Sequence, residues 1–291
     1  MDGDFGAFKS RIQAGVQQHL ERTFDAHPNT EVYRVARYVA LGGGHRWRAM
    51  VAVAAGEIFD PAAFSIAMPA ACGVELAHTA SLVLDDLPSM DDARLRRGKP
   101  CVHLVFPRWA VDMAPVSLVT MAYHMILDNS LACHDRRVAA ALELSLAGSR
   151  MIHGQEIDVA QQAENADREE CLLECFRLKC GALFAAAAKT GALLCGADPK
   201  EASRLEHCGL NLGMCYQILD DLVDVVEDRD EPGKETGTDA AKGTTVELFG
   251  FEKAKRRANR LKQDALEAVE EFGPKAELLR SVIRQASRAL D

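Results

Sequence analysis

The stretch ELAHTASLVLDDLPSMDDARLRRGKP, residues 75–100, contains an apolar run, four aspartates and four basic residues, in that order. Apolar residues at three-to-four spacing before the acids predict a helix, on which His78 lies two turns before Asp85. Pro88 should end this helix, because proline has no amide hydrogen and clashes with the preceding turn. The later aspartates would then return toward the first pair from a loop.

A second acidic cluster, DDLVD at 220–224, lies in another apolar helical segment. Helical spacing places Gln217, Asp220 and Asp224 on one face. Carboxylates in apolar surroundings need a partner, and Mg²⁺ prefers oxygen ligands, including those of phosphate. Two such clusters predict a diphosphate held between magnesium ions. The alternative is that each Asp-Asp pair is a solvated helix terminus, which the apolar flanks of both clusters disfavour.

Basic residues follow the first acids directly. Arginine can engage phosphate oxygens through two parallel hydrogen bonds, whereas lysine acts as a point charge. A second basic group follows Gly42, Gly43 and Gly44 in LGGGHRWRAM, residues 41–50. Glycines let the backbone approach an anion closely, although a glycine run is as often a simple turn.

The chain resembles the trans-isoprenyl diphosphate synthases, and most closely the bacterial type of geranylgeranyl diphosphate synthase. The resemblance covers residues 30–250 and rests on segments that occur in the order of the family. It implies a prenyltransferase that joins isopentenyl diphosphate to an allylic diphosphate. The segments are GGGHRWR at 42–48, the stretch at 75–100, GQEID at 154–158, KCGALF at 179–184, YQILDDLVD at 216–224 and GKETGTDAAKGTT at 233–245.

The resemblance also implies roles for individual residues. It implies that three Mg²⁺ ions hold and ionise the allylic diphosphate, with the ligands Asp85, Asp86, Asp91, Asp220 and Asp224. The catalytic set that it implies is Asp85, Asp86, Asp220, Lys179 and Gln217, of which Gln217 lines the reaction centre. The implied contacts of the allylic diphosphate are Arg96, Lys179, Lys234 and Lys242, and those of isopentenyl diphosphate are Arg48, His78, Arg97 and, in place of a lysine, His45.

Several positions depart from the family pattern, and three of them bear on function. His45 replaces a lysine, which makes one phosphate contact pH-dependent or removes it. Cys180 replaces a threonine beside the cation, and Pro115 should kink or interrupt its helix. These departures motivate a second hypothesis, an accessory subunit that alters the product of a partner synthase, and a terpene cyclase is a third. The acidic clusters argue against the accessory role, and the residues of the isopentenyl site argue against a cyclase.

The residues just before the first aspartates bear on product length. In the resembled family, the side chains four and five positions upstream form the floor on which the growing chain stops. Here these residues are Ser81 and Ala80, and their small size implies a C20 product, geranylgeranyl diphosphate. The alternative is that Ala80 only permits close helix packing, since alanine is common in helices.

Helical periodicity recurs along the chain, and no segment alternates convincingly with period two. We therefore expect an all-α, single-domain helical bundle over residues 1–291, and the resemblance implies the isoprenoid synthase type with a central cavity. A chain of 291 residues with 48% hydrophobic content can bury such a core. The expected helices are 5–25, 31–43, 47–58, 65–87, 108–131, 135–159, 168–196, 199–226 and 251–290, with a loop at 227–245.

Composition favours a cytoplasmic enzyme. A net charge of −9 argues against nucleic acid as a partner, and nine scattered cysteines are typical of reduced thiols. The segment MDGDFGAFKS lacks the basic start of a signal peptide. The longest apolar run, residues 180–197, contains Lys189 and predicts a buried helix, so we expect no membrane span. A homodimer is implied by the resemblance alone.

Overall fold

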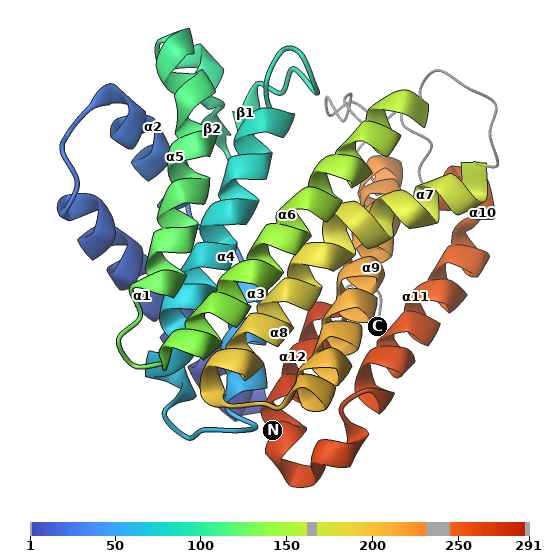
Figure 1. The fold of residues 1–291 in the computed structure, drawn as a ribbon. Helices are drawn as coiled ribbons and strands as arrows, with labels where there is room; N and C mark the ends of the chain where they lie inside the picture. Colours follow the sequence, from blue (N-terminus) through green and yellow to red (C-terminus); the bar gives the residue numbers. More distant parts are fainter. Residues whose placement is uncertain (1, 162–167, 231–244, 289–291) are drawn as a thin grey trace.

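The computed structural model describes residues 2–161, 168–230 and 245–288, which form a helical bundle (Figure 1). The expected all-α class is confirmed. The helices are α1 (Asp2–Asp25), α2 (Glu31–Ala40), α3 (Trp47–Gly56), α4 (Ala63–Asp85), α5 (Arg108–Leu127), α6 (His134–Gln161), α7 (Arg168–Phe176), α8 (Ala182–Cys195), α9 (Pro199–Asp230), α10 (Thr245–Phe249), α11 (Phe251–Glu267) and α12 (Glu277–Ala286).

Short irregular segments join some of these helices. A π-helical turn, η2 (Arg177–Gly181), links α7 to α8, and two 3-10 segments are η1 (Val102–Leu104) and η3 (Glu270–Ala276). One antiparallel pair of two-residue strands, β1 (Leu95–Arg96) and β2 (Lys99–Pro100), forms a small hairpin after α4. The sequence did not predict this hairpin.

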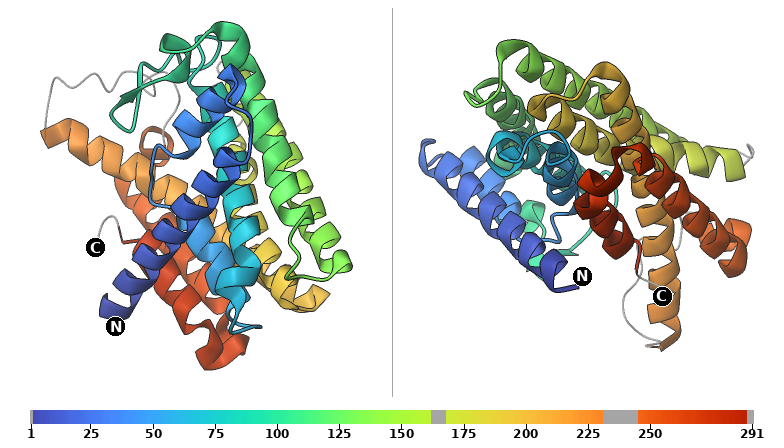
Figure 2. Two further views of the ribbon diagram at one scale, coloured as in Figure 1. Left: turned by 90° about the vertical axis from the view of Figure 1, so that its left-hand side faces the viewer. Right: turned by 90° about the horizontal axis from the view of Figure 1, so that it is seen from below.

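Helices α3 and α8 lie at the centre of the bundle and pack closely because glycine removes a side chain at the contact. A Cβ atom at Gly191 of α8 would lie 1.9 Å from the carbonyl oxygen of Ala52 in α3. Gly209 of α9 allows a similar approach to Phe184 of α8, whose carbonyl oxygen would lie 2.4 Å from an added Cβ. Helices α1 and α2 lie on one side of this core, and α11 and α12 lie on the other (Figure 2).

A buried ion pair fixes the start of α3 against α4. Arg46 Nη1 lies 3.1 Å from Glu75 Oε2, and both side chains are about 5% exposed. Arg46 Nη2 also donates to the carbonyl oxygen of Ala40 at the end of α2, and the amide of Ala49 donates to Glu75 Oε1. Arg46 therefore joins three helices.

Most expected helices are present, with three differences. The predicted interruption at Pro115 is wrong, because α5 is continuous through this residue, which is buried and lines the cavity described below. The helix predicted over 251–290 is broken by η3, where Gly273 has a φ of 55° and precedes Pro274. The loop predicted at 227–245 is wrong at both ends, because α9 continues to Asp230 and α10 begins at Thr245. Residues 231–244 lie outside the described residues. Helix α4 ends at Asp85, before Pro88, as the sequence predicts.

The apolar run at 180–197 forms α8, and nearly all of its side chains are buried, as predicted. Among the described residues, α4 and α5 have the length and hydropathy of a membrane span. Of their most apolar windows, 67% and 50% of the residues are buried in the bundle. Core helices of globular proteins share these properties, so this is weak evidence for a span.

Candidate active site

A cavity of about 2190 Å³ lies between α4, α5, α6, η2 and α9, and it includes residues of both acidic clusters. Asp85 is the last residue of α4, and the second cluster lies two turns before the end of α9. These helix ends meet at the upper end of the bundle in Figure 1. The acidic residues that line the cavity are Asp85, Asp91, Asp220, Asp221 and Asp224, together with Glu75, Glu156, Asp158 and Glu247.

Asp86 differs from the other predicted metal ligands. It is 4% exposed, does not line this cavity, and accepts hydrogen bonds from Arg96 Nη2 at 2.5 Å and Arg96 Nε at 3.0 Å. Burial lowers the pKa of Arg96, but the hydrogen bond and charge of Asp86 outweigh it and raise that pKa. Successive helical positions point about 100° apart, so Asp86 faces away from Asp85. In this structure Asp86 therefore positions Arg96, which does line the cavity.

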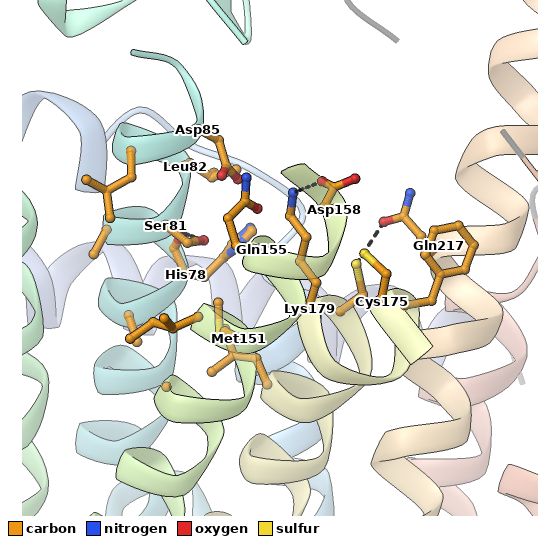
Figure 3. A pocket seen from close by; sticks show the side chains of 18 of the residues that line it. His78, Ser81, Leu82, Asp85, Met151, Gln155, Asp158, Cys175, Lys179 and Gln217 are labelled. Carbon is orange, nitrogen blue, oxygen red and sulfur yellow. Dashed lines mark hydrogen bonds and ion pairs between the residues drawn. The ribbon is translucent and has the colours of Figure 1, made fainter. Parts of the chain in front are cut away.

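Lys179 reaches the mouth of the cavity from the π-helical turn η2. Its Nζ lies 2.9 Å from Asp158 Oδ2 of α6, close to Asp85 (Figure 3). Burial lowers the pKa of Lys179, but the charges of Asp85 and Asp158 outweigh burial and raise it above the usual range. Gly154 permits this approach, because a Cβ there would lie 2.7 Å from the amide nitrogen of Lys179. The ammonium group is thus held charged beside the first acidic cluster.

Asp158 and Gln155 were not assigned a role from the sequence, although both occur in the GQEID segment. Gln155 lies between Asp85 and Lys179 in Figure 3. Its amide oxygen is buried and has no hydrogen-bond partner among the described residues. The i, i+3 spacing of these two residues on one face of α6 is the only signal that could have found them.

Gln217 is fixed between a thiol and a carboxylate. Cys180 Sγ donates to Gln217 Oε1 at 3.0 Å, and Gln217 Nε2 donates to Asp221 Oδ1 at 2.9 Å. The amide and hydroxyl of Thr245 donate to the other oxygen of Asp221. Burial raises the pKa of Cys180 to about 11, so the group is a neutral thiol that can donate. The cysteine that replaces the family's threonine thus still orients Gln217.

Arg48, His78 and Arg97 form a basic group in the same cavity. Arg48 Nε is buried without a hydrogen-bond partner among the described residues, and the guanidinium lies 4.6 Å from the centre of the Phe184 ring. Burial, reinforced by the charges of Arg48 and Arg97, lowers the pKa of His78 well below its usual value. A neutral imidazole beside a guanidinium whose buried Nε–H lacks a hydrogen-bond partner suits an incoming anion.

The remaining predicted residues are placed as follows. His45 lines the cavity and stacks on Trp47, with 6.3 Å between the ring centres. Ala80 and Ser81 also line the cavity, and the hydroxyl of Ser81 donates to the carbonyl oxygen of His78 at 2.9 Å. Lys234 and Lys242 lie outside the described residues.

The donor set fits magnesium bound together with a phosphate ligand. Among the described residues, no three His, Cys, Asp or Glu side chains are close enough to hold a metal by themselves. Mg²⁺ is usually held by one or two carboxylates, with phosphate oxygens and water completing the octahedron. Carboxylates spread over two helix ends around one cavity match that mode better than a closed protein cage.

Comparison with known proteins decides the family. The family described as Polyprenyl synthetase matches residues 29–281 of this chain. The chain belongs to the polyprenyl synthetase family. The family recognised from the sequence motifs is therefore confirmed. Its members named below are prenyl diphosphate synthases or geranyltransferases, so the chain is a transferase of prenyl groups.

Curated relatives in this family carry different product names. The chain is 36% identical over 274 residues to geranylgeranyl pyrophosphate synthase 12, chloroplastic, of Arabidopsis thaliana, covering 91% of this chain and 75% of the relative. It is 34% identical over 285 residues to a probable farnesyl diphosphate synthase of Sinorhizobium fredii, covering 94% of this chain and 85% of the relative. Product length is therefore not decided by similarity.

Solved structures in the same family share the fold. An FPP/GFPP synthase from Zymomonas mobilis is 27% identical with a TM-score of 0.86, covering 98% of this chain and all of that chain. A geranyltransferase from Helicobacter pylori, solved with magnesium and isoprenyl diphosphate, is 27% identical with a TM-score of 0.77, covering 96% of this chain and 97% of that chain. These likenesses confirm the isoprenoid synthase type of all-α fold.

Proposed function

We propose that this prenyltransferase condenses isopentenyl diphosphate with an allylic diphosphate and releases geranylgeranyl diphosphate. The observation that carries the proposal is that one cavity contains residues of both acidic clusters and, beside them, a basic group in which Arg48 Nε has no hydrogen-bond partner among the described residues. A two-substrate condensation needs two diphosphate sites, whereas a cyclase needs one. The basic group around Arg48 therefore favours the condensation.

The acidic end of the cavity would hold the allylic diphosphate. Asp85, Asp91, Asp220 and Asp224 would hold Mg²⁺, and we keep the proposal of three ions per site. Bound magnesium supplies positive charge that stabilises the departing diphosphate. Lys179, fixed by Asp158, and Arg96, fixed by Asp86, add charge from the protein itself. We also propose diphosphate contacts for Lys234 and Lys242.

The basic group would hold isopentenyl diphosphate so that its double bond faces the allylic carbon. Arg48 and Arg97 would neutralise the diphosphate, and neutral His78 would donate a hydrogen bond to it. The double bond attacks the allylic carbon as the diphosphate leaves, and the released diphosphate accepts the proton that is lost. Gln217, held by Cys180 and Asp221, would orient groups at this centre. Apolar walls exclude the water that would otherwise capture the cation.

The small residues below the first aspartates support the C20 product. Ala80 is 3% exposed and lines the cavity with only a methyl group, and Ser81 contributes a hydroxymethyl group. Neither side chain is large enough to stop a fifteen-carbon chain.

We further propose that the enzyme is a cytoplasmic homodimer of single-domain chains. Helices α5 and α6 expose a series of large apolar side chains, some of which also line the cavity. A second copy packed against these helices would cover them. The exposed apolar side chains are Trp109, Met113, Val116, Val119 and Leu127 on α5, and Val138, Leu142, Leu146, Ile152 and Val159 on α6.

Incubating the purified protein with Mg²⁺, farnesyl diphosphate and isopentenyl diphosphate tests the function. We expect consumption of isopentenyl diphosphate and a C20 diphosphate, both abolished by EDTA. A cyclised hydrocarbon formed without isopentenyl diphosphate would support a cyclase. Turnover only when a partner synthase is added would support an accessory subunit.

A further inference from the structure

One face of α6 forms a wall of the cavity from its mouth to its deepest point. Reading inward, the wall consists of Asp158, Gln155, Met151, Gly148 and Leu144, at alternating spacings of three and four residues. Fourteen residues separate the first from the last, which is about 21 Å at 1.5 Å per residue. On this stripe the polar residues are at the mouth, and Met151, Gly148 and Leu144 follow further in. Ser145 and Ser149, on the adjoining face of α6, also line the cavity.

Two close contacts between helices show how far the residues at the inner end of the cavity lie from its acidic end. Gly154 of α6 lies against the amide of Lys179, and Leu144 is ten residues earlier, about 15 Å further in. On the opposite side, Gly73 of α4 lies against the carbonyl oxygen of Ala122 in α5, and Gly73 is twelve residues, about 18 Å, before Asp85. Tyr123 follows Ala122 directly. Leu144 and Tyr123 therefore lie at similar distances from the acidic end of the cavity.

Tyr123 and Leu144 end the cavity. They are the deepest lining residues on α5 and α6, and both pack against the hydrophobic core. Leu144 is 2% exposed, and the next residues inward on both helices, Ile126 and Ala140, are fully buried. An extended chain that enters at the acidic end would meet these two side chains last.

Gly148 leaves the wall open above this floor. A Cβ atom added at Gly148 would have no atom within 4 Å, although the residue lies inside a helix and lines the cavity. Its φ is that of an ordinary helix, so no backbone strain demands glycine here. Glycine is the poorest helix former after proline. Gly148 is therefore unfavourable for helix stability, and its absent side chain leaves open space in the channel.

We propose that Gly148 opens the lower half of the prenyl channel and that Tyr123 and Leu144 form its floor, so that product length is set there and not at Ala80 and Ser81. The proposal rests on the proposed function. The small side chains on α4 only allow the chain to pass. A bulky group at position 148 would divide the channel about 15 Å from Asp158, halfway between Met151 and Leu144 in sequence.

The test replaces Gly148 and sizes the products. Gly148→Leu should give a product at least one isoprene unit shorter than that of the unmodified enzyme. Gly148→Ala should have a small effect, and Tyr123→Ala should lengthen the product. Tyr123→Phe keeps the ring and should leave product length unchanged. Gly6→Leu is a matched control, because Gly6 is also helical, has no atom within 4 Å of an added Cβ and does not line the cavity.

Binding of prenyl diphosphates separates this inference from the proposed function. Compared with the unmodified protein, Gly148→Leu should bind geranylgeranyl diphosphate about tenfold more weakly and geranyl diphosphate equally well. This comparison does not require that either the variant or the unmodified protein be catalytically active. Unchanged product length and unchanged binding in Gly148→Leu would overturn the channel assignment. If the unmodified protein fails to consume isopentenyl diphosphate, the proposed function is wrong. The channel assignment would still stand if Gly148→Leu selectively loses binding of the long-chain diphosphate.

Discussion

The ammonium nitrogen of Lys179 lies 2.9 Å from the carboxylate of Asp158, and this pair ties the π-helical turn η2 to α6 at the mouth of the cavity. A π-helical turn inserts one extra residue and is often found at functional sites. Here it brings the lysine beside Asp85 of the first acidic cluster. The carboxylate of Asp158 fixes the direction of the ammonium group and, with Asp85, keeps it charged.

Lys179→Met should lower kcat by about a hundredfold, because it removes a charge aimed at the leaving group. Asp158→Asn keeps the shape of the side chain and should cost less, mainly by raising KM for the allylic substrate. Steady-state kinetics with each substrate varied in turn measures both effects. Lys200→Met, at an exposed lysine of α9 outside the cavity, is the control. Equal losses in Lys179→Met and Lys200→Met would contradict a role for Lys179 at the leaving group.

Arg46→Met should destabilise the fold by about 3–5 kcal/mol, because it leaves the buried carboxylate of Glu75 without its partner. Urea denaturation followed by circular dichroism measures the change in free energy of unfolding. The exposed pair of Arg34 and Glu31 on α2 provides the comparison, and Arg34→Met should cost less than about 1 kcal/mol. Similar losses in the two variants would mean that burial does not strengthen the Arg46 pair.

The fold was largely predictable because long helices repeat one periodicity, whereas the differences arise from tertiary packing. Pro115 lacks an amide hydrogen, yet α5 continues through it, and the residue is buried in the bundle. The β1–β2 hairpin has two residues per strand, too few to show an alternating pattern. Gly273 and Pro274 are visible breakers, but the periodicity around them outweighed them in the prediction.

At the site, helical spacing showed which residues share a face but not how side chains pair. The ion pair of Asp86 with Arg96 depends on the direction of the chain after α4 ends, which a sequence pattern does not specify. Asp158 gave no signal of its own, because its partner is supplied by the π-helical turn, which sequence periodicity does not reveal. Gly148 was missed because its effect is an absence of atoms in a three-dimensional channel.

His45→Lys should improve binding of isopentenyl diphosphate, because lysine carries a full positive charge at neutral pH. The side chain is exposed, so the gain should be modest, up to about fivefold in KM. KM for the allylic substrate should not change. An unchanged KM for isopentenyl diphosphate, or a parallel change for the allylic substrate, would show that position 45 does not contact this diphosphate.

His78→Gln should make the protein less sensitive to acid. Burial, with the charges of Arg48 and Arg97, holds the pKa of His78 well below its usual value, so the native state keeps this group neutral below pH 6.5. In the unfolded state histidine binds a proton below about pH 6.5. The unfolded state then binds more protons, and the free energy of unfolding falls as pH decreases.

For this single group the loss between pH 7 and pH 5 should reach about 2 kcal/mol, and His78→Gln should remove it. Urea denaturation at pH 5, 6 and 7 gives the free energies of unfolding from which the slopes are compared. His134→Gln serves as the control, because its ring is 79% exposed and its loss should leave the slope unchanged. Parallel pH dependences for the unmodified protein and His78→Gln would show that His78 is charged in the native cavity, and the neutral hydrogen-bond role proposed for it would then be wrong.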